Sequence, residues 1–202
     1  MSATLPALVL ASASRSRAAV LAHAGVPFVQ DAAAVDEDAV KARQRGEGAS
    51  ARQCALALAE LKALAVSPRH PGALVLGCDQ MLDCDGRWFD KPKDIAAARA
   101  QLADLRGRTH VLVNGMVLVR DGRAQWSHAD AATLRMRAFS DAFLDGYLGT
   151  VGEAALHAVG AYQLEGRGAQ LFERIDGDFF SILGLPLLPL LAVLREHGLL
   201  QT

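Results

Sequence analysis

The sequence lacks the features that mark secreted, membrane-spanning and disulfide-bonded proteins. It has only three cysteines, Cys54, Cys78 and Cys84, an odd number without a CxxC pair, which predicts reduced thiols in a cytosol. No run of about 18 apolar residues exists that could cross a bilayer, and Met1 to Pro6 holds no basic cluster of a signal peptide. We therefore expect a cytoplasmic protein with no membrane partner.

An excess of charge of one sign is missing too. The chain has 21 Lys and Arg against 22 Asp and Glu, so its formal net charge is −1. Without a global positive field we expect no nucleic-acid partner, and any anion site must be local. The 202 residues, 51% of them hydrophobic, predict a single folded domain over 1–202, or two lobes that share a cleft.

Signatures of several well-known active sites are absent. The sequence contains neither the GxGxxG of a dinucleotide fold nor the GxxxxGK[ST] of a P-loop. Its six histidines show no HExxH or other ligand spacing, which argues against His-bound zinc. Because Ser12 and Ser14 lie outside any GxSxG context, nothing indicates a serine hydrolase.

Short apolar runs alternate with helical segments along the whole chain. We predict strands near 8–11, 27–32, 73–82, 111–119, 131–136 and 170–175. We predict helices over 14–24, 50–66, 94–105, 140–148 and 187–197, and turns at 85–86 and 121–122. This order predicts an α/β fold around a mixed, twisted central sheet flanked by helices.

A turn of small residues joins the first predicted strand to the first predicted helix. Residues 11–17 read ASASRSR, so the backbone can approach a ligand closely while helix N–H groups and arginines favour an anion. We interpret Ser12, Ser14 and Arg17 as a phosphate site. The alternative is an ordinary capped helix with solvated arginines.

Two acidic segments and a lysine complete the candidate chemistry. Val35 is followed by three carboxylates, of which Glu37 is a candidate metal ligand, since Mg²⁺ binds one or two carboxylates plus substrate phosphates; an acidic helix start is the alternative. Asp79 lies near the carboxyl end of an apolar strand and is a candidate metal ligand or general base. Lys91, held beside Pro92, could neutralise a transferring phosphate.

Taken together in their order along the chain, the sequence motifs resemble those of the Maf family of nucleotide pyrophosphatases. The resemblance spans nearly the whole chain and lies in Leu10-Ala11-Ser12-Ala13-Ser14 with Arg17, Val35-Asp36-Glu37, Ala59-Glu60-Leu61-Lys62-Ala63, Gly77-Cys78-Asp79, Lys91-Pro92-Lys93-Asp94, Gly107-Arg108-Thr109-His110, Gly160-Ala161-Tyr162, Glu165-Gly166-Arg167-Gly168 and Gly184-Leu185-Pro186. No single motif decides the match, and their joint order is specific.

The resemblance implies a fold, a cofactor and roles for individual residues. It implies two lobes around a deep cleft, as in Maf and ITPase-like proteins, activity with Mg²⁺ or Mn²⁺, and a homodimer. Asp79 would activate water, with Lys62 and Lys91 as the other catalytic residues. Ser12 and Arg17 would hold phosphates together with the lysines, and Glu37 would help to bind the metal.

Three positions concern the choice of substrate. The family branch that acts on dTTP and UTP has Arg, Thr and Gln where this chain has Ser16, Gln80 and Glu165. Gln80 and Glu165 are similar to the branch that takes 7-methyl-GTP, although Ser16 is not that branch's tryptophan. A carboxylate at Glu165 could accept hydrogen bonds from the N–H groups of guanine, or could instead pair with Arg167.

We therefore expect a pyrophosphatase that takes a small-molecule nucleotide, with a modified purine such as 7-methyl-GTP favoured. The alternatives are a dTTP/UTP pyrophosphatase, a nucleotidyltransferase, and a non-catalytic nucleotide-binding regulator of cell division.

Overall fold

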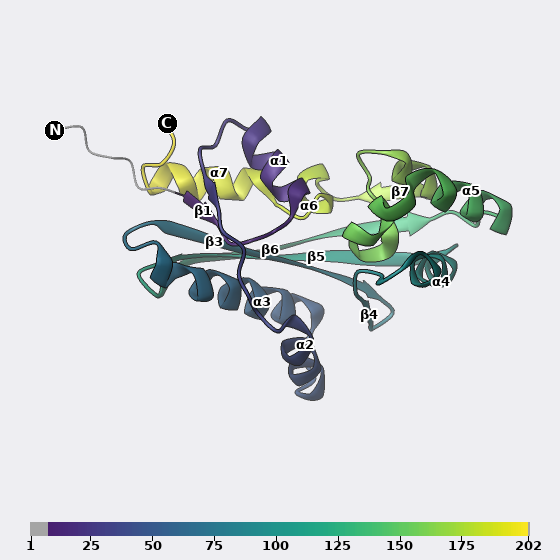
Figure 1. The fold of residues 1–202 in the computed structure, drawn as a ribbon, viewed down its shortest axis with the longest axis horizontal. Coiled ribbons are helices and arrows are strands. Elements are labelled where there is room, and N and C mark those ends of the chain that lie inside the picture. The colour runs from purple at the N-terminus through teal and green to yellow at the C-terminus, as the bar shows by residue number, and fades with distance from the viewer. Residues whose placement is uncertain (1–7, 202) are drawn as a thin grey trace. The chain divides into compact units, whose positions relative to one another are not determined.

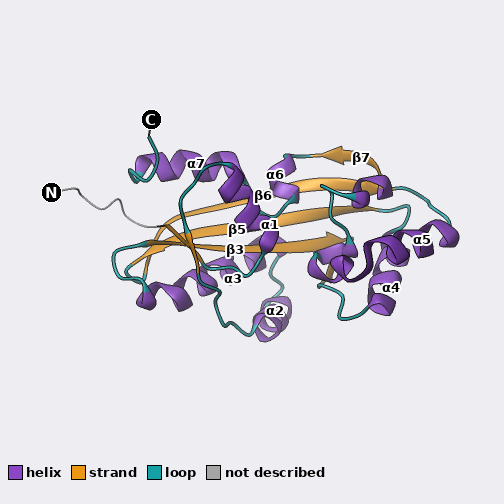
Figure 2. Ribbon diagram, turned by 45° about the horizontal axis from the view of Figure 1, so that its top comes forward, coloured by secondary structure: helices purple, strands orange, loops and turns teal. Residues whose placement is uncertain are grey.

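The computed structural model describes residues 8–201, and strands and helices alternate along them (Figures 1 and 2). Its first half contains β1 (Leu8–Leu10), α1 (Arg15–His23), β2 (Val29–Gln30), α2 (Glu37–Gly46), α3 (Ala51–Val66), η1 (Ser67–Arg69), β3 (Leu74–Cys84), β4 (Arg87–Phe89) and α4 (Ile95–Leu105). Its second half contains β5 (Thr109–Arg120), β6 (Arg123–Met136), α5 (Asp141–Val151), η2 (Gly152–His157), η3 (Val159–Ala161), η4 (Arg167–Leu171), β7 (Phe172–Asp176), α6 (Phe179–Ile182) and α7 (Leu187–Glu196).

The strands form one mixed, seven-stranded sheet, which confirms the predicted fold class. Hydrogen bonds join them in the order β2-β1-β3-β5-β6-β7, and β4 pairs with β3. β1 runs parallel to both β2 and β3, whereas the β3–β4 and β6–β7 pairs are antiparallel. The chain divides into two compact units, of which the first comprises the chain up to Asp79, Asn114–Asp130 and the chain from Gly184, and the second comprises Gln80–Val113 and Ala131–Leu183.

In the first unit, α3 covers one face of the sheet, and α1 and α7 cover the opposite face (Figures 1 and 2). Two glycines allow α3 to approach very closely. A Cβ atom at Gly77 of β3 would lie 1.9 Å from the carbonyl oxygen of Ala59, and one at Gly115 of β5 would lie 2.5 Å from the carbonyl of Ala55. Small side chains of α3, such as Ala59 and Ala63, are therefore completely buried against the strands.

The second unit has a core of its own. Leu82 of β3 lies opposite Phe89 of β4, and both are buried in this core together with Leu134 of β6. The helices α4 and α5 contribute buried leucines to this core, including Leu102 and Leu144. The folding of each unit thus rests on its own apolar cluster.

Most predicted helices begin where their capping residues stand. The side chains of Ser14, Ser50, Asp94 and Ser140 each accept a hydrogen bond from the first turn of the helix that follows. The predicted turns are also confirmed, since Asp85-Gly86 and Asp121-Gly122 both adopt positive φ angles between paired strands.

Some predicted boundaries were wrong. β3 continues to Cys84 because Leu82 and Cys84 keep apolar side chains on its buried face, so Asp79 lies in mid-strand and not near its end. The parallel pairing with β1 nevertheless stops at Leu76. β6 begins at Arg123, well before the predicted start. The prediction missed its exposed first half because the polar residues there give little strand signal.

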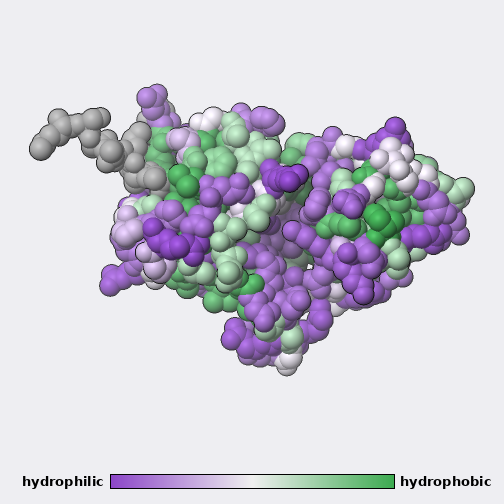
Figure 3. Space-filling view, viewed as in Figure 1, coloured by the Kyte–Doolittle hydropathy of each residue, from purple (hydrophilic) through white to green (hydrophobic). Residues whose placement is uncertain are grey.

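The helix α2 is peripheral and polar. None of its residues is buried, and its surface is predominantly hydrophilic at the lower centre of the view in Figure 3. Over residues 8–201, no helix has the length and apolar character needed to cross a membrane.

Candidate active site

A buried lysine joins two carboxylates in the first unit. The Nζ atom of Lys62 lies 2.6 Å from Oδ1 of Asp79 and 2.7 Å from Oε1 of Glu37. Lys62 is 8% exposed and Asp79 is 4% exposed, so this contact is shielded from water on most sides. Residues from α2, α3 and β3, three separate segments of the sequence, thereby form a single charged cluster.

The close approach of α3 to β3 explains why Lys62 can reach Asp79. Gly77, two residues before Asp79, presents only hydrogen to the α3 backbone at Ala59 and Ala63. Lys62 lies on the same buried side of α3, which its neighbours Ala59 and Ala63 share. A larger residue at position 77 would push the helix, and with it the ammonium group, away from the strand.

Local helix geometry places Glu37. The side chain of Asp36 caps α2 by accepting a hydrogen bond of 3.0 Å from the N–H of Ala39, so Glu37 stands in the first turn of that helix. The acidic helix start that was the alternative interpretation is therefore real. It does not replace the functional one, because Glu37 still reaches Lys62.

One carboxylate oxygen of the cluster is left without a partner. Oδ2 of Asp79 is buried and has no hydrogen-bond partner among residues 8–201. A buried charged oxygen is costly unless a cation or donor satisfies it. No group of three His, Cys, Asp or Glu residues suited to a metal occurs in the described part of the chain. Asp79 and Glu37 instead fit a hard cation that takes its remaining ligands from substrate phosphates and water.

The small-residue turn before α1 is organised around Arg17. Its Nε donates to the carbonyl of Gly184 at 2.8 Å, and Nη1 donates at 3.1 Å both to Oγ of Ser12 and to the carbonyl of Cys78. Arg17 is 9% exposed, so the alternative of solvated arginines is wrong for this residue. Within residues 8–201, no carboxylate pairs with Arg17, and its Nη2 has no hydrogen-bond partner.

The two serines of this turn, Ser12 and Ser14, have different structural roles. Ser14 caps α1 by accepting from the N–H of Arg17 at 3.3 Å. Oγ of Ser12 accepts from Arg17 and from the N–H of Ser14, so its own hydrogen is free to be donated to a ligand. With an unneutralised guanidinium beside it, the turn is suited to an anion.

Sequence reasoning missed the backbone groups and the glutamine that fix this turn. Gln30 donates from Nε2 to the carbonyl of Ser12 at 2.7 Å, and the carbonyls of Cys78 and Gly184 orient Arg17. Backbone acceptors carry no side-chain signature, so nothing in the sequence could have singled them out. Burial raises the pKa of the Cys78 thiol to about 11, which disfavours the thiolate that a nucleophilic cysteine needs.

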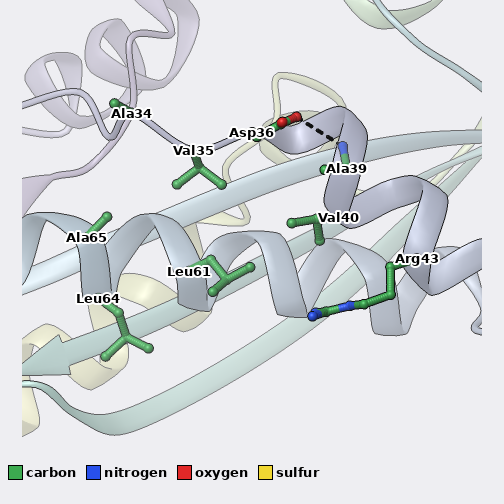
Figure 4. Close-up of a pocket in the computed structure, with 9 residues that line it drawn as sticks. All are labelled: Ala34, Val35, Asp36, Ala39, Val40, Arg43, Leu61, Leu64 and Ala65. Atoms are coloured by element: carbon green, nitrogen blue, oxygen red, sulfur yellow. Dashed lines mark hydrogen bonds between the residues drawn. The ribbon is translucent and has the colours of Figure 1, made fainter.

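A pocket of about 610 Å³ lies between α2, α3 and the chain before α2 (Figure 4). Its lining includes Asp36 and Leu61, the sequence neighbours of Glu37 and Lys62. Val35, Val40, Leu61 and Leu64 give it an apolar lining, and Arg43 stands at one side. Because no residue of α2 is buried, Glu37 stands on a helix at the surface of the first unit.

Of the remaining predicted residues, Ser16 belongs to the first unit, and Gln80, Lys91 and Glu165 belong to the second. Ser16 is half-buried in α1. Gln80 donates from Nε2 to the carbonyls of Ser181 and Ile182, at 3.1 and 3.2 Å, and so holds the end of α6. Lys91 is exposed in the segment between β4 and α4. Glu165 is exposed and forms no salt bridge with Arg167, which removes the ion-pair alternative for that glutamate.

Comparisons with known proteins agree with these motifs. A family model described as Maf-like protein matches residues 7–197. A protein from Paramagnetospirillum magneticum named nucleoside triphosphate pyrophosphatase is 59% identical over 190 residues, which cover 94% of this chain and 98% of that protein. A protein of the same name from Rhodospirillum rubrum is 52% identical over 200 residues, covering 99% of each.

Another relative carries a more specific name. A protein from Brucella abortus biovar 1 named 7-methyl-GTP pyrophosphatase is 51% identical over 190 residues, covering 94% of this chain and 96% of that protein.

Proposed function

Because this chain belongs to the Maf family, we propose that it is a nucleoside triphosphate pyrophosphatase, an enzyme that hydrolyses the bond between the α- and β-phosphates. The products are a nucleoside monophosphate and pyrophosphate. The proposal depends mainly on the buried Asp79, whose Oδ1 contacts Lys62 and whose Oδ2 has no partner among the described residues. The same unit contains Arg17, a buried cation that no carboxylate of the described residues neutralises.

The cationic side chains and the small-residue turn account for phosphate binding. Arg17 can donate from Nη2 to a phosphate oxygen without breaking its present hydrogen bonds, and Ser12 can donate its hydroxyl hydrogen. The N–H groups of the first turn of α1 lie at the small-residue turn, and the helix dipole there favours an anion. The ammonium of Lys62 supplies a further positive charge.

Asp79 and Glu37 would hold the divalent cation, Mg²⁺ or Mn²⁺, which when bound neutralises phosphate charge and lowers the pKa of water. We assign to Asp79 the acceptance of the proton from the attacking water, since its Oδ2 is the buried oxygen that has an acceptor position free. Lys91 is proposed as a further catalytic lysine on the family resemblance alone.

For the base, we propose a modified purine such as 7-methyl-GTP. Gln80 uses both donor positions of its amide on the carbonyls of α6, so only its Oε1 acceptor is available to a ligand. Glu165 offers only acceptors in its ionised form and has no cationic partner in the part of the chain the structure describes. Two acceptors suit the N–H groups of a guanine edge better than the single such donor of uracil or thymine.

We also propose a cellular compartment and an oligomeric state for the protein. Cys54, Cys78 and Cys84 are all buried and none of the three forms a disulfide, which is consistent with a reducing cytoplasm. We further propose a homodimer that binds nucleotide and no nucleic acid, to be tested by sedimentation and by nucleic-acid titration.

The decisive experiment measures products from a panel of nucleotides that includes 7-methyl-GTP, dTTP and UTP. We expect equal amounts of monophosphate and pyrophosphate with Mg²⁺ or Mn²⁺, no reaction in EDTA, and recovery when metal is restored. Full activity in EDTA would refute the metal-assisted reaction. Nucleotide binding without pyrophosphate release would favour a regulator, and release that requires an added acceptor would favour a nucleotidyltransferase.

A further inference from the structure

The ammonium of Lys62 contacts both Glu37 and Asp79, the two carboxylates proposed to hold the divalent cation. Its Nζ is within 2.7 Å of one oxygen from each carboxylate, and the side chains of Lys62 and Asp79 are only 10% and 6% exposed. An ammonium group is a compact charge with three donors, and here it neutralises one of two negative charges. Oε1 of Glu37 and Oδ1 of Asp79 are thereby occupied.

A divalent cation must compete with Lys62 for these oxygens. The oxygens not bound to Lys62 are Oδ2 of Asp79, which has no partner among the described residues, and Oε2 of Glu37, which lies 3.8 Å from Nζ of Lys41. Lys62 would also repel a cation placed next to it. This repulsion is strong at a few ångströms inside a protein, where the effective dielectric constant is about 20.

We propose that Lys62 acts as a stand-in cation in the nucleotide-free protein, and that the phosphates of the incoming nucleotide draw it away, so that the divalent cation enters together with the substrate. This inference rests on the proposed function, because it requires a polyphosphate ligand. Lysine has a flexible four-carbon stem and binds phosphate as a point charge, so it can exchange one partner for the other. Glu37 can follow, since α2 has no buried residue.

The test is a titration with Mn²⁺ followed by electron paramagnetic resonance, first without nucleotide. Lys62→Met removes the ammonium and nearly preserves the side-chain length. We expect it to bind Mn²⁺ at least about tenfold more tightly than the wild type, because the ammonium that contacts both carboxylates is then removed. Lys62→Gln provides a second, polar variant in case methionine disturbs folding, and circular dichroism with urea unfolding checks both.

Lys41→Met is the matched control. Lys41 also faces Glu37, but at 3.8 Å, compared with 2.7 Å for Lys62. Its removal should change the Mn²⁺ affinity by less than about threefold, as for a partly solvated ion pair. An equal effect of Lys41→Met and Lys62→Met would mean that only general charge matters, and would overturn the proposal.

A second titration includes an α,β-methylene nucleoside triphosphate, which cannot be cleaved at the α–β bridge. The nucleotide should tighten Mn²⁺ binding more in the wild type than in Lys62→Met, because only the wild type has an ammonium to displace. Equal Mn²⁺ affinity of wild type and Lys62 variants without nucleotide would overturn the inference. Pyrophosphate release by the wild type is measured separately, and its absence would contradict the proposed function whatever the Mn²⁺ titrations show.

Discussion

The two oxygens of Asp79 have different surroundings. Oδ1 contacts the Lys62 ammonium at 2.6 Å, whereas Oδ2 has no hydrogen-bond partner among residues 8–201. Lys62 stabilises the negative charge of the buried carboxylate, and the second oxygen stays available to water or metal. Such an incompletely satisfied buried group is unusual in a part of a protein that only needs to be stable.

Asp79→Asn should therefore reduce turnover about 10²- to 10⁴-fold, the usual effect of losing a positioned acid or base. Asparagine keeps the shape and an oxygen for Lys62 but lacks the negative charge. Steady-state pyrophosphate release measures the loss, and urea unfolding checks that the fold persists. A variant that retains more than about a tenth of the wild-type rate would show that Asp79 is not the catalytic carboxylate.

A buried histidine gives the second unit a pH-dependent stability. His110 is 1% exposed, its Nε2 lies 2.7 Å from the hydroxyl of Tyr162, and burial lowers its pKa to about 4. The folded state therefore resists protonation while the unfolded chain, with a histidine pKa near its ordinary value, takes up a proton. This contribution to stability is complete above about pH 6.5 and is lost as the pH falls toward 4.

We expect the free energy of unfolding to fall by about 2 kcal/mol between pH 7 and pH 5 through this residue alone. His110→Gln cannot be protonated, so its stability, although lower at pH 7, should change less over the same range. Urea unfolding at both pH values provides the comparison. Parallel pH dependence in the variant and the wild type would assign the effect to other groups.

At the level of elements, the contact of α3 with β3 sets the geometry of the charged cluster. α3 carries Lys62 and β3 carries Asp79, and the absence of a side chain at Gly77 determines how near the two backbones come. The position of the ammonium group thus depends on a residue that performs no chemistry itself.

Gly77→Ala tests this dependence. Its Cβ would meet the Ala59 carbonyl oxygen at 1.9 Å and the Ala63 nitrogen at 2.9 Å, so the helix must shift. We expect a loss of stability of about 1–3 kcal/mol or more, as for other overpacked cores, and a fall in kcat beyond the loss of folded protein. Gly146→Ala in α5 is the control, because its Cβ would meet nothing within 4 Å; this change should leave kcat intact and should not lower the stability.

Local sequence signals predicted the elements that have local causes. Capping residues such as Ser50 and Asp94 located helix starts because one side chain decides them. The start of α2 was one of two interpretations of its acidic segment, but its extent was not predicted because α2 has no buried face to create a pattern. The helix α6 was missed because it spans only Phe179–Ile182. The early start of β6 was missed because pairing with its neighbour, and not its own composition, keeps residues 123–130 extended.

The site was foreseeable in its parts but not in its assembly. Residue types and turns pointed to Arg17, Glu37 and Asp79, and the family resemblance added Lys62. That Lys62 joins two carboxylates, and that carbonyls of Cys78 and Gly184 hold Arg17, depends on contacts between distant segments. Such contacts arise from packing, which no local pattern in a single sequence records.

Considered over the whole molecule, the predicted roles divide between the two units. Arg17, Glu37, Lys62 and Asp79, the residues proposed for phosphate and metal, belong to the first unit. Gln80 and Glu165, proposed to select the base, belong to the second unit together with Lys91. Substitutions in the first group should lower the rate for every nucleotide alike, whereas substitutions at Gln80 and Glu165 should change the order of preference among bases.

The triple change Ser16→Arg, Gln80→Thr and Glu165→Gln tests the proposed base preference, since it introduces the residues of the dTTP/UTP branch at one position of the first unit and two of the second. We expect the ratio of kcat/KM for dTTP or UTP over that for 7-methyl-GTP to rise, because a polar group left unpaired by the wrong base penalises binding. Kinetics on all three nucleotides give the ratio.

The single variants Gln80→Thr and Glu165→Gln separate effects on base preference from effects on the stability of the fold. Gln80→Thr also removes the hydrogen bonds to the carbonyls of Ser181 and Ile182, so it should loosen α6, which hydrogen exchange can detect. Glu165→Gln alters an exposed side chain without a salt bridge and should shift preference without changing stability. If the triple variant and Glu165→Gln lose activity equally on every nucleotide, these residues do not read the base, and the purine assignment fails.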